Sequence, residues 1–173
     1  MEHLKYPVGK FSFPENIDPI QRSKFKNSIN EFPLKLNELL HDMDPQMLEK
    51  QYRPDGWTGR QVIHHLADSH SHALIRFKWS LTEVDPTIKP YLEAKNAILA
   101  DYSQPVESAL FIIQGVHIKW QNIMESMSDE DWARGYIHPE TKRYFRLDTA
   151  AAMYDWHGRH HLAHIALCKE PSI

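Results

Sequence analysis

The clearest structural signal in the chain is TGRQVIHHLADSHSHALIRFKWSLTE, residues 58–83. Thr58 and Gln61 match a capping box, in which each side chain satisfies a backbone donor at the start of a helix. Apolar side chains then recur every three or four residues, which is the spacing of one face of a helix. The pattern ends before Pro86, in a stretch typical of turns. We therefore expect one long amphipathic helix over residues 58–83.

Three further stretches have helical spacing, and the remaining segments have the composition of arms and loops. The other predicted long helices cover residues 19–43, 105–127 and 148–169. Residues 136–147 are rich in Tyr, Ile and Phe, which predicts a small hairpin or an extended loop before the last helix. Residues 1–18 are expected to form an extended arm. Four long helices joined by modest loops predict one all-α domain over residues 1–173, a four-helix bundle.

The composition excludes several classes of protein. A length of 173 residues suits one domain. The formal net charge of −3, without a basic stripe, argues against binding to nucleic acid or anionic lipid. No run of about 18 apolar residues predicts a membrane span. The single cysteine, Cys168, excludes a disulfide framework and a cysteine-rich zinc site. The N-terminal residues lack the apolar segment of a signal peptide, so we expect the protein in the cytoplasm.

Histidine is unusually frequent, and its placement suggests a metal site. Eight of the 12 histidines fall in two short stretches: His64, His65, His70 and His72, and His157, His160, His161 and His164. Residues four apart differ by about 40° around a helix, so His157 and His161 project from one face. Two neutral imidazoles at this spacing can bind one zinc, copper or nickel ion together. His160 and His164 have the same spacing, and spacing alone does not choose between the two pairs.

A third ligand is expected from the helix over residues 58–83. His64 and His65 are about 100° apart on that helix, so only one of them can face a given neighbour. His65 borders the apolar side and is the one expected to point between helices. Helical bundles commonly build metal sites from facing helices. Three protein ligands leave one coordination position for water or substrate, which is the pattern of catalytic zinc. The alternatives are histidines that are only hydrogen-bonded, and a metal that only stabilises the bundle.

The histidine motifs resemble those of a known family. GWTGRQVIHHLADSH (residues 56–70) resembles the second-helix signature of the DinB/YfiT-like superfamily, and WHGRHHLAHI (residues 156–165) resembles its fourth-helix signature. RFKWSLTE (residues 76–83), GYIHPETK (residues 135–142) and residues 6–9 are also similar, so the likeness covers almost the whole chain. The resemblance implies a four-helix bundle and a homodimer. It also implies one divalent metal ion, zinc in first place and nickel as the alternative, bound by His65, His157 and His161.

The resemblance is less informative about the reaction. It implies a metal-dependent hydrolase that activates a water against a small-molecule substrate. The family also includes mycothiol-dependent isomerases and bacillithiol transferases, so an S-transferase using a low-molecular-weight thiol is the first alternative. A non-catalytic metal-binding stress-response protein is the second. The sequence identifies no general base. Asp68 and His160 are the candidates for holding a ligand histidine in place, and a surface carboxylate is an equally simple interpretation of Asp68.

Overall fold

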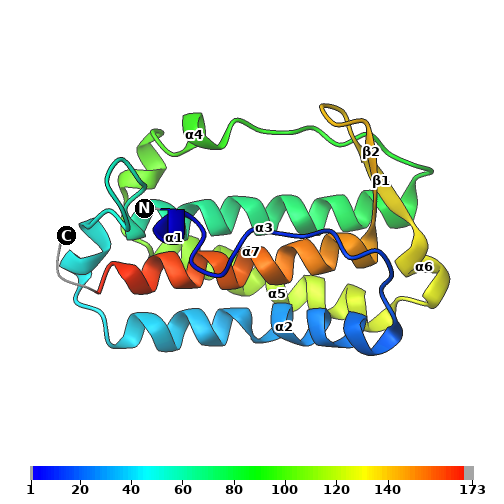
Figure 1. Cartoon of the computed structure of the whole chain (residues 1–173), viewed down its shortest axis with the longest axis horizontal. Helices are drawn as coiled ribbons and strands as arrows, with labels where there is room; N and C mark the ends of the chain where they lie inside the picture. Colours follow the sequence, from blue (N-terminus) through cyan, green and yellow to red (C-terminus); the bar gives the residue numbers. More distant parts are fainter. Residues whose placement is uncertain (1, 170–173) are drawn as a thin grey trace.

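The computed structural model describes residues 2–169, and four long helices dominate this part of the chain. They lie side by side along the longest axis of the molecule (Figure 1) and are α2 (Pro19–His41), α3 (Gly59–Thr82), α5 (Glu107–Ser126) and α7 (Leu147–Leu167). All four are close to the ranges predicted from periodicity. The structure therefore confirms the all-α prediction and the four-helix bundle.

Side-chain caps fix where two of these helices, α2 and α3, begin. At α3 the hydroxyl of Thr58 accepts from the backbone of Gln61, and the Gln61 side chain accepts from the backbone of Thr58, which confirms the predicted capping box. Asp18 and Gln21 form the same motif at α2, where Pro19 occupies the first helical position. Each cap is worth about 1 kcal/mol. Local sequence thus sets where α2 and α3 begin.

Short helical elements lie before the first long helix and in the connections between the long helices. They are α1 (Glu2–Lys5), the 3-10 helices η1 (Pro45–Glu49) and η2 (Ala100–Ser103), α4 (Glu93–Asn96) and α6 (Asp129–Ala133). The predicted extended arm therefore begins with one helical turn. Figure 1 shows the connection between α3 and α5 running back along the top of the molecule, where it carries α4 and η2. Neither of these two turns was predicted from the sequence.

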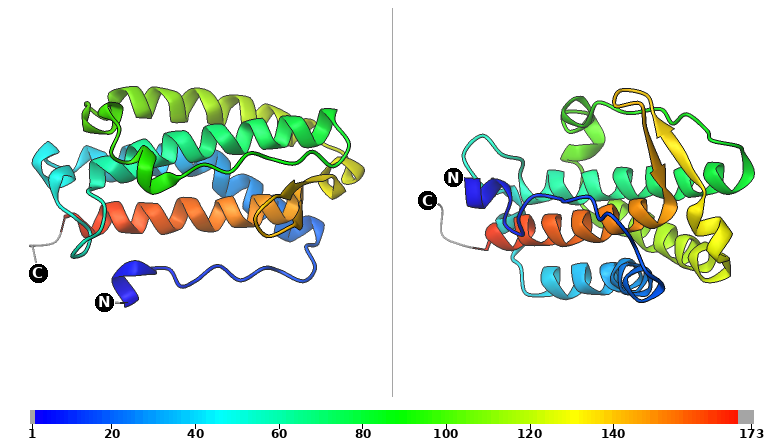
Figure 2. Two further views of the ribbon diagram at one scale, coloured as in Figure 1. Left: turned by 90° about the horizontal axis from the view of Figure 1, so that it is seen from above. Right: turned by 45° about the vertical axis from the view of Figure 1, so that its right-hand side comes forward.

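A two-stranded antiparallel hairpin precedes α7, as the sequence predicted. Its strands are β1 (Gly135–His138) and β2 (Arg143–Arg146), and Gly135 pairs with Arg146. A Cβ atom at Gly135 would lie 2.0 Å from the carbonyl oxygen of Phe145, so only glycine allows the strands to approach this closely. The hairpin stands beside the start of α7 (Figure 2, right). It closes one end of the bundle.

Two hydrophobic clusters form the core and leave room for a polar layer. One contains Phe77, Trp120 and Leu147 and lies toward the hairpin, and the other contains Val62, Leu66 and Ile165. On α7 the last buried residue of the first cluster is Tyr154, and the first buried residue of the second cluster is Ile165. His157, His160, His161 and His164 occupy the turns between them. The bundle therefore places its histidines where apolar packing is interrupted.

The segment that follows α1 runs alongside α7, as Figures 1 and 2 show. The indole Nε1 of Trp156 donates to the carbonyl of Gly9 at 3.0 Å, and the ring of Phe11 lies 5.8 Å from that of Trp156.

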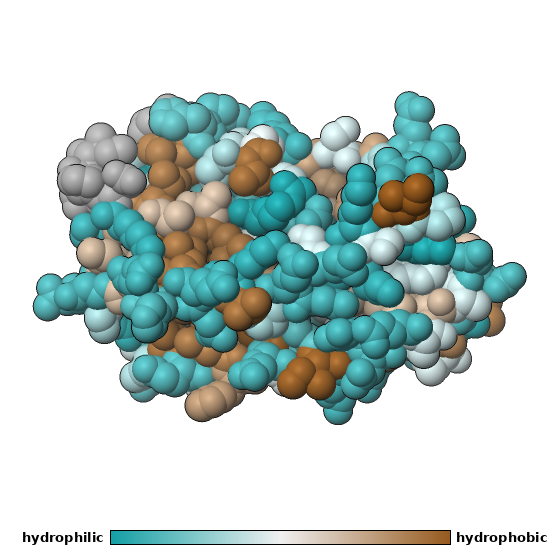
Figure 3. Space-filling view, turned by 90° about the horizontal axis from the view of Figure 1, so that it is seen from below, coloured by the Kyte–Doolittle hydropathy of each residue, from teal (hydrophilic) through white to brown (hydrophobic). Residues whose placement is uncertain are grey.

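On the face seen in Figure 3, hydrophobic side chains gather mainly in the left half. Within residues 2–169 no helix is both long and apolar enough to cross a membrane.

Candidate metal centre

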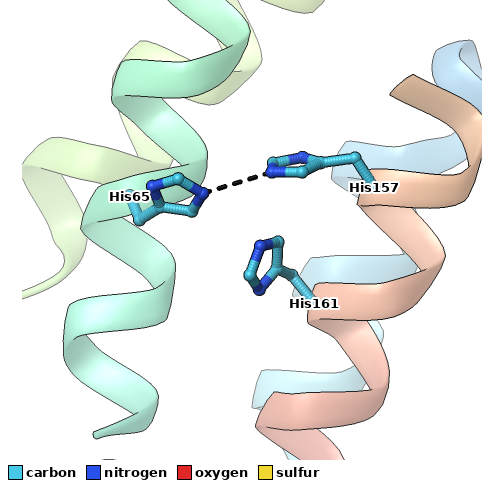
Figure 4. Close-up of side chains that lie close together, drawn as sticks. All are labelled: His65, His157 and His161. Carbon is cyan, nitrogen blue, oxygen red and sulfur yellow. Dashed lines mark hydrogen bonds between the residues drawn. The ribbon is translucent and has the colours of Figure 1, made fainter. Parts of the chain in front are cut away.

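The structure brings together the three histidines that the sequence singled out. His65 projects from α3 toward His157 and His161 of α7 (Figure 4). Nε2 of His65 lies 3.2 Å from Nε2 of His157. One ring nitrogen of each of the three residues lies within 4.8 Å of one from each of the others. Facing helices therefore present three imidazoles to one small volume.

The donor set of this cluster fits a divalent transition metal. Imidazole nitrogens bind zinc at about 2.0–2.1 Å, so two nitrogens of a tetrahedral site lie about 3.3–3.4 Å apart. The 3.2 Å between His65 and His157 is close to that separation. Imidazole is a ligand that zinc, nickel and copper accept. One pair of nitrogens is thus already at the separation that an ion requires, and a ring nitrogen of His161 lies within 4.8 Å of one from each of the other two.

Burial keeps these imidazoles neutral, which metal binding requires. Desolvation, aided by the nearby His160, lowers the pKa of His65 to about 4. The pKa values of His157 and His161 are held well below the ordinary value, first by burial and then by their histidine neighbours. A charged ring would add a buried, unpaired cation beside the others. At neutral pH each ring therefore keeps a nitrogen lone pair.

A hydrogen-bonded chain selects which nitrogen of His161 has the lone pair. Nε2 of His164 lies 3.3 Å from the carbonyl oxygen of Lys5, which can only accept, so Nε2 is the protonated nitrogen. Nδ1 of the neutral His164 is then an acceptor, and it lies 3.3 Å from Nδ1 of His161. His161 therefore donates through Nδ1 and keeps its lone pair on Nε2. The sequence offered only one hint of this role, because His164 lies three residues after His161.

A second chain of the same kind lies beside His157. Nδ1 of His117 lies 2.8 Å from the carbonyl oxygen of Ile29, and Nε2 of His117 lies 2.8 Å from Nδ1 of His70. This order leaves the lone pair of His70 on Nε2, which is buried without a hydrogen-bond partner in the described structure. The rings of His70 and His157 are 5.7 Å apart. Neither His70 nor His117 had been assigned a role from the sequence.

The competing pair, His160 and His164, also takes part in a cluster. Each of these residues has a ring nitrogen within 4.8 Å of one from His161 and from the other. Both nitrogens of His164 are engaged, one with Lys5 and the other with His161. His160 stacks on Trp156 at 4.5 Å, and its Nδ1 is buried without a partner in the described structure. This cluster, drawn from α7 alone, therefore depends on His164, whose two nitrogens are both engaged.

Asp68, a candidate for holding a ligand histidine in place, is hydrogen-bonded to other elements. Asp68 accepts from the hydroxyl of Tyr102 at 2.8 Å and from the amide of Asn96 at 3.5 Å, and no hydrogen bond within residues 2–169 joins it to a histidine. Asp68 therefore anchors the connection that carries α4 and η2. His64 points away from the cluster, because its Nε2 lies 3.1 Å from the carbonyl oxygen of Gln104. His164, rather than Asp68 or His160, is the residue that holds one of the three histidines.

Two hollows reach the cluster from different sides. The larger, which we call the hairpin cleft, has a volume of about 690 Å³ and is lined by Ser69, Arg76, Tyr91, Tyr136, Tyr154 and His157, among others. The smaller has a volume of about 320 Å³ and is lined by residues that include Tyr6, Tyr52, Arg53, His160, His161 and His164. Clefts of about 300–1,000 Å³ are typical of small-molecule sites. The cluster is thus accessible to small ligands.

Known proteins share both the sequence and the fold. The profile of the DinB superfamily matches residues 31–165. A protein of Bacillus cereus (strain 03BB102), named "Putative metal-dependent hydrolase", is 42% identical over 165 residues, which cover 95% of each chain. A protein of the same name from Bacillus anthracis (strain CDC 684 / NRRL 3495) is 41% identical over the same share.

One solved structure is similar over nearly the full length. YfiT from Bacillus subtilis, described as a probable metal-dependent hydrolase with an unusual four-helix bundle topology, superposes with a TM-score of 0.92. The two sequences are 39% identical, and the match covers 96% of each chain. Sequence profile, relatives and structure agree, and they confirm the resemblance based on the histidine motifs. The chain belongs to the DinB superfamily.

Proposed function

We propose that this protein is a metal-dependent hydrolase that acts on a small molecule bound in the hairpin cleft. The observation that carries the proposal is the cluster of His65, His157 and His161, with His157 in the wall of that cleft. These three residues would hold one divalent ion, zinc in first place and nickel as the alternative. The names of the relatives support metal dependence and hydrolysis in the same terms.

The ion and the protein would make different contributions. When bound, a divalent ion supplies Lewis-acid chemistry, because it can lower the pKa of water toward about 7 and polarise the bond to be cleaved. The chain supplies three neutral donors, and the chain of hydrogen bonds from Lys5 through His164 orients His161. Tyrosine and phenylalanine side chains in the hairpin cleft would bind the organic part of the substrate and exclude water.

Access to the cluster favours catalysis over simple metal storage. A storage or structural site commonly has four protein ligands and no open coordination position. Here the candidate set has three histidines, and His157 and His161 line different hollows. A fourth protein ligand, found by X-ray absorption on the metal-loaded protein, would contradict the hydrolase proposal.

The test begins with protein purified without a nickel column. Its metal content is measured, the metal is removed with a chelator, and zinc or nickel is restored. We expect hydrolysis of at least one member of a panel of esters and amides, lost on chelation and recovered with metal. His65→Ala should lose the activity. His64→Ala is the matched control, because His64 is adjacent in sequence but points to Gln104. Metal-loaded protein that is inert toward the whole panel would count against the proposal.

A thiol assay separates the proposed hydrolase from an S-transferase. The loaded protein is incubated with bacillithiol and an aryl chloride, from which the thiolate sulfur would displace chloride. The hydrolase proposal predicts no protein-dependent conjugation. Conjugation that is lost on chelation, in a protein that hydrolyses none of the panel, would replace hydrolysis with thiol transfer as the function.

A further inference from the structure

We propose that Arg76 binds an acidic group of the substrate, so that the hairpin cleft selects small organic acids. This inference rests on the proposed use of the cleft as the substrate site. Arg76 lies on α3 and lines the cleft together with His157. The hydroxyl of Tyr154 accepts from Nη1 of Arg76 at 3.2 Å, and the ring of Tyr154 lies 6.0 Å from that of His157. One tyrosine therefore separates the guanidinium from the candidate metal centre.

The guanidinium of Arg76 has donors to spare. It is half-buried, and none of the ion pairs formed within residues 2–169 involves it. A guanidinium has five N–H donors, and the bond to Tyr154 uses one of them. Tyr136 adds a side-chain hydrogen bond and a cation–π contact at 6.0 Å, and neither provides a negative charge. A carboxylate or phosphate of a ligand would accept two of the remaining donors side by side.

No acidic side chain within residues 2–169 forms an ion pair with Arg76. Glu93 of α4 lines the same cleft, and partial desolvation raises its pKa while the charge of Arg76 opposes the rise. An established ion pair would instead have lowered that pKa. Glu93 therefore leaves the donors of Arg76 free, although its negative charge repels an acidic ligand. Glu140 and Lys95 also line the cleft, so Arg76 is one of its two permanently charged cations.

The remaining walls indicate what the acidic group is attached to. Leu92, Phe145 and Met153 provide apolar surface, and three tyrosines provide polar groups next to it. Burial raises the pKa of Tyr91 and of Tyr136, so both keep their hydroxyl protons and can donate to an anion or to a carbonyl. A ligand with an apolar or aromatic body and one acidic end matches this lining.

Binding in the absence of metal tests the inference independently of catalysis. The probes are 3-phenylpropanoate and its neutral amide, titrated into metal-free protein and followed by calorimetry, with phenyl phosphate as a second acid. We expect both acids to bind at least tenfold more tightly than the amide. Equal affinities for acid and amide would overturn the inference. This experiment measures binding and no hydrolysis. The inference about Arg76 can therefore fail while the hydrolase proposal stands, and the hydrolase proposal can fail while the inference about Arg76 stands.

Three variants assign any preference to Arg76. Arg76→Gln should remove the preference for the acids, and Arg76→Lys should keep part of it, since lysine retains the charge without the planar donors. Lys95→Gln is the matched control, because it removes the other cation of the cleft and should leave the preference intact. Glu93→Gln should strengthen binding of the acids. Thermal unfolding of each variant checks that it is folded. A preference that persists in Arg76→Gln, or vanishes in Lys95→Gln, would overturn the inference.

Discussion

His161 belongs to both histidine clusters, so its neighbours decide which cluster binds metal. The cluster with His65 draws on two helices, whereas the cluster with His160 depends on His164, whose two nitrogens are both hydrogen-bonded. His65→Ala and His161→Ala should each lose most of the metal affinity, and His160→Ala should retain it. Competition with a coloured chelator measures this directly. Equal losses in His65→Ala and His160→Ala would show that the proposed ligand set is wrong.

His164 should tune the metal without binding it. Its Nδ1 accepts from His161 and its Nε2 donates to Lys5, so it fixes the tautomer that His161 needs. Loss of such a partner commonly costs 10–100-fold in metal affinity. We expect a loss of about tenfold in His164→Ala. His164→Gln should recover part of it, since its amide can accept from one residue and donate to the other. Full affinity in His164→Ala, by the same chelator competition, would contradict this role.

The buried pair His70 and His117 should make the folded, metal-free protein less stable in acid. Burial lowers the pKa of His117 to about 4 and holds that of His70 well below its ordinary value, against about 6.5 in an unfolded chain. Above pH about 7 both residues are neutral in either state. As the pH falls from about 6.5 toward 4, the unfolded chain gains protons that the folded one refuses, so stability falls.

Urea unfolding at several pH values measures the effect. We expect the free energy of unfolding to decrease by roughly 1–3 kcal/mol for each buried histidine between pH 6.5 and 4. Replacing both His70 and His117 by leucine should give a shallower dependence. A free energy of unfolding that is flat over this range would show that the buried rings take up protons as easily as exposed ones.

The long helices could be predicted from sequence because their signals are local. Thr58 and Gln61 cap α3 through their own side chains, and the apolar period of the helix continues to its end. The turns α4 and η2 have four residues each, too short to show a period. Their position depends on Asp68 of α3, which accepts hydrogen bonds from Asn96 and Tyr102. Such contacts cannot be inferred from neighbouring residues.

The candidate site could be predicted in part, for a related reason. Helical spacing places His157 and His161 on one face, but it left His160 and His164 as an equal pair. The family resemblance made the choice, and the structure brings the chosen three together. The roles of His164 and His117 depend on the carbonyls of Lys5 and Ile29, which lie far away in the sequence. No periodicity within α5 or α7 predicts those contacts.

The hairpin should matter for the cleft more than for the metal. Phe145 and Tyr136 are hairpin residues that line the cleft, and both strands meet closely at Gly135. In Gly135→Ala the new Cβ would lie 2.0 Å from a carbonyl oxygen of β2, so the strand must move. We expect weaker binding of 3-phenylpropanoate, by at least tenfold, with unchanged metal affinity. Calorimetry and chelator competition measure the two separately. A parallel loss of both would mean that the hairpin supports the bundle as a whole.

At the scale of the whole molecule, the histidine layer interrupts a core that is otherwise apolar. Two hydrophobic clusters pack on either side of it, and the hollows that reach it lie at the hairpin cleft and beside the N-terminal segment. Substrate would therefore approach through the hairpin cleft. The smaller hollow is lined by Lys5, His161 and His164, the residues of the hydrogen-bonded chain that orients His161. The homodimer implied by the family resemblance remains a prediction, which light scattering in solution can test.

The N-terminal segment links the stability of the bundle to the metal centre. Residues 2–13 contribute the Lys5 carbonyl to His164, the Gly9 carbonyl to Trp156, and Phe13 to a ring contact with Phe145 at 5.8 Å. A chain that begins at residue 14 should keep its four long helices. The caps of α2 and α3 and the buried residues of both hydrophobic clusters all lie outside residues 2–13. The shortened chain should nevertheless unfold at a lower temperature, by about 2–4 °C for each kcal/mol lost.

The chain that begins at residue 14 should lose as much metal affinity as His164→Ala, because His164 then lacks the Lys5 carbonyl that fixes its tautomer. Trp156→Phe is the control, because it removes the hydrogen bond to Gly9 and leaves Lys5 in place. The full chain, the shortened chain and Trp156→Phe are compared. Thermal unfolding measures the loss of stability, and chelator competition measures the loss of metal affinity. If the shortened chain bound metal as tightly as the full chain, the carbonyl of Lys5 would have no part in orienting His161, and the hydrogen-bonded chain through His164 would be a packing feature only.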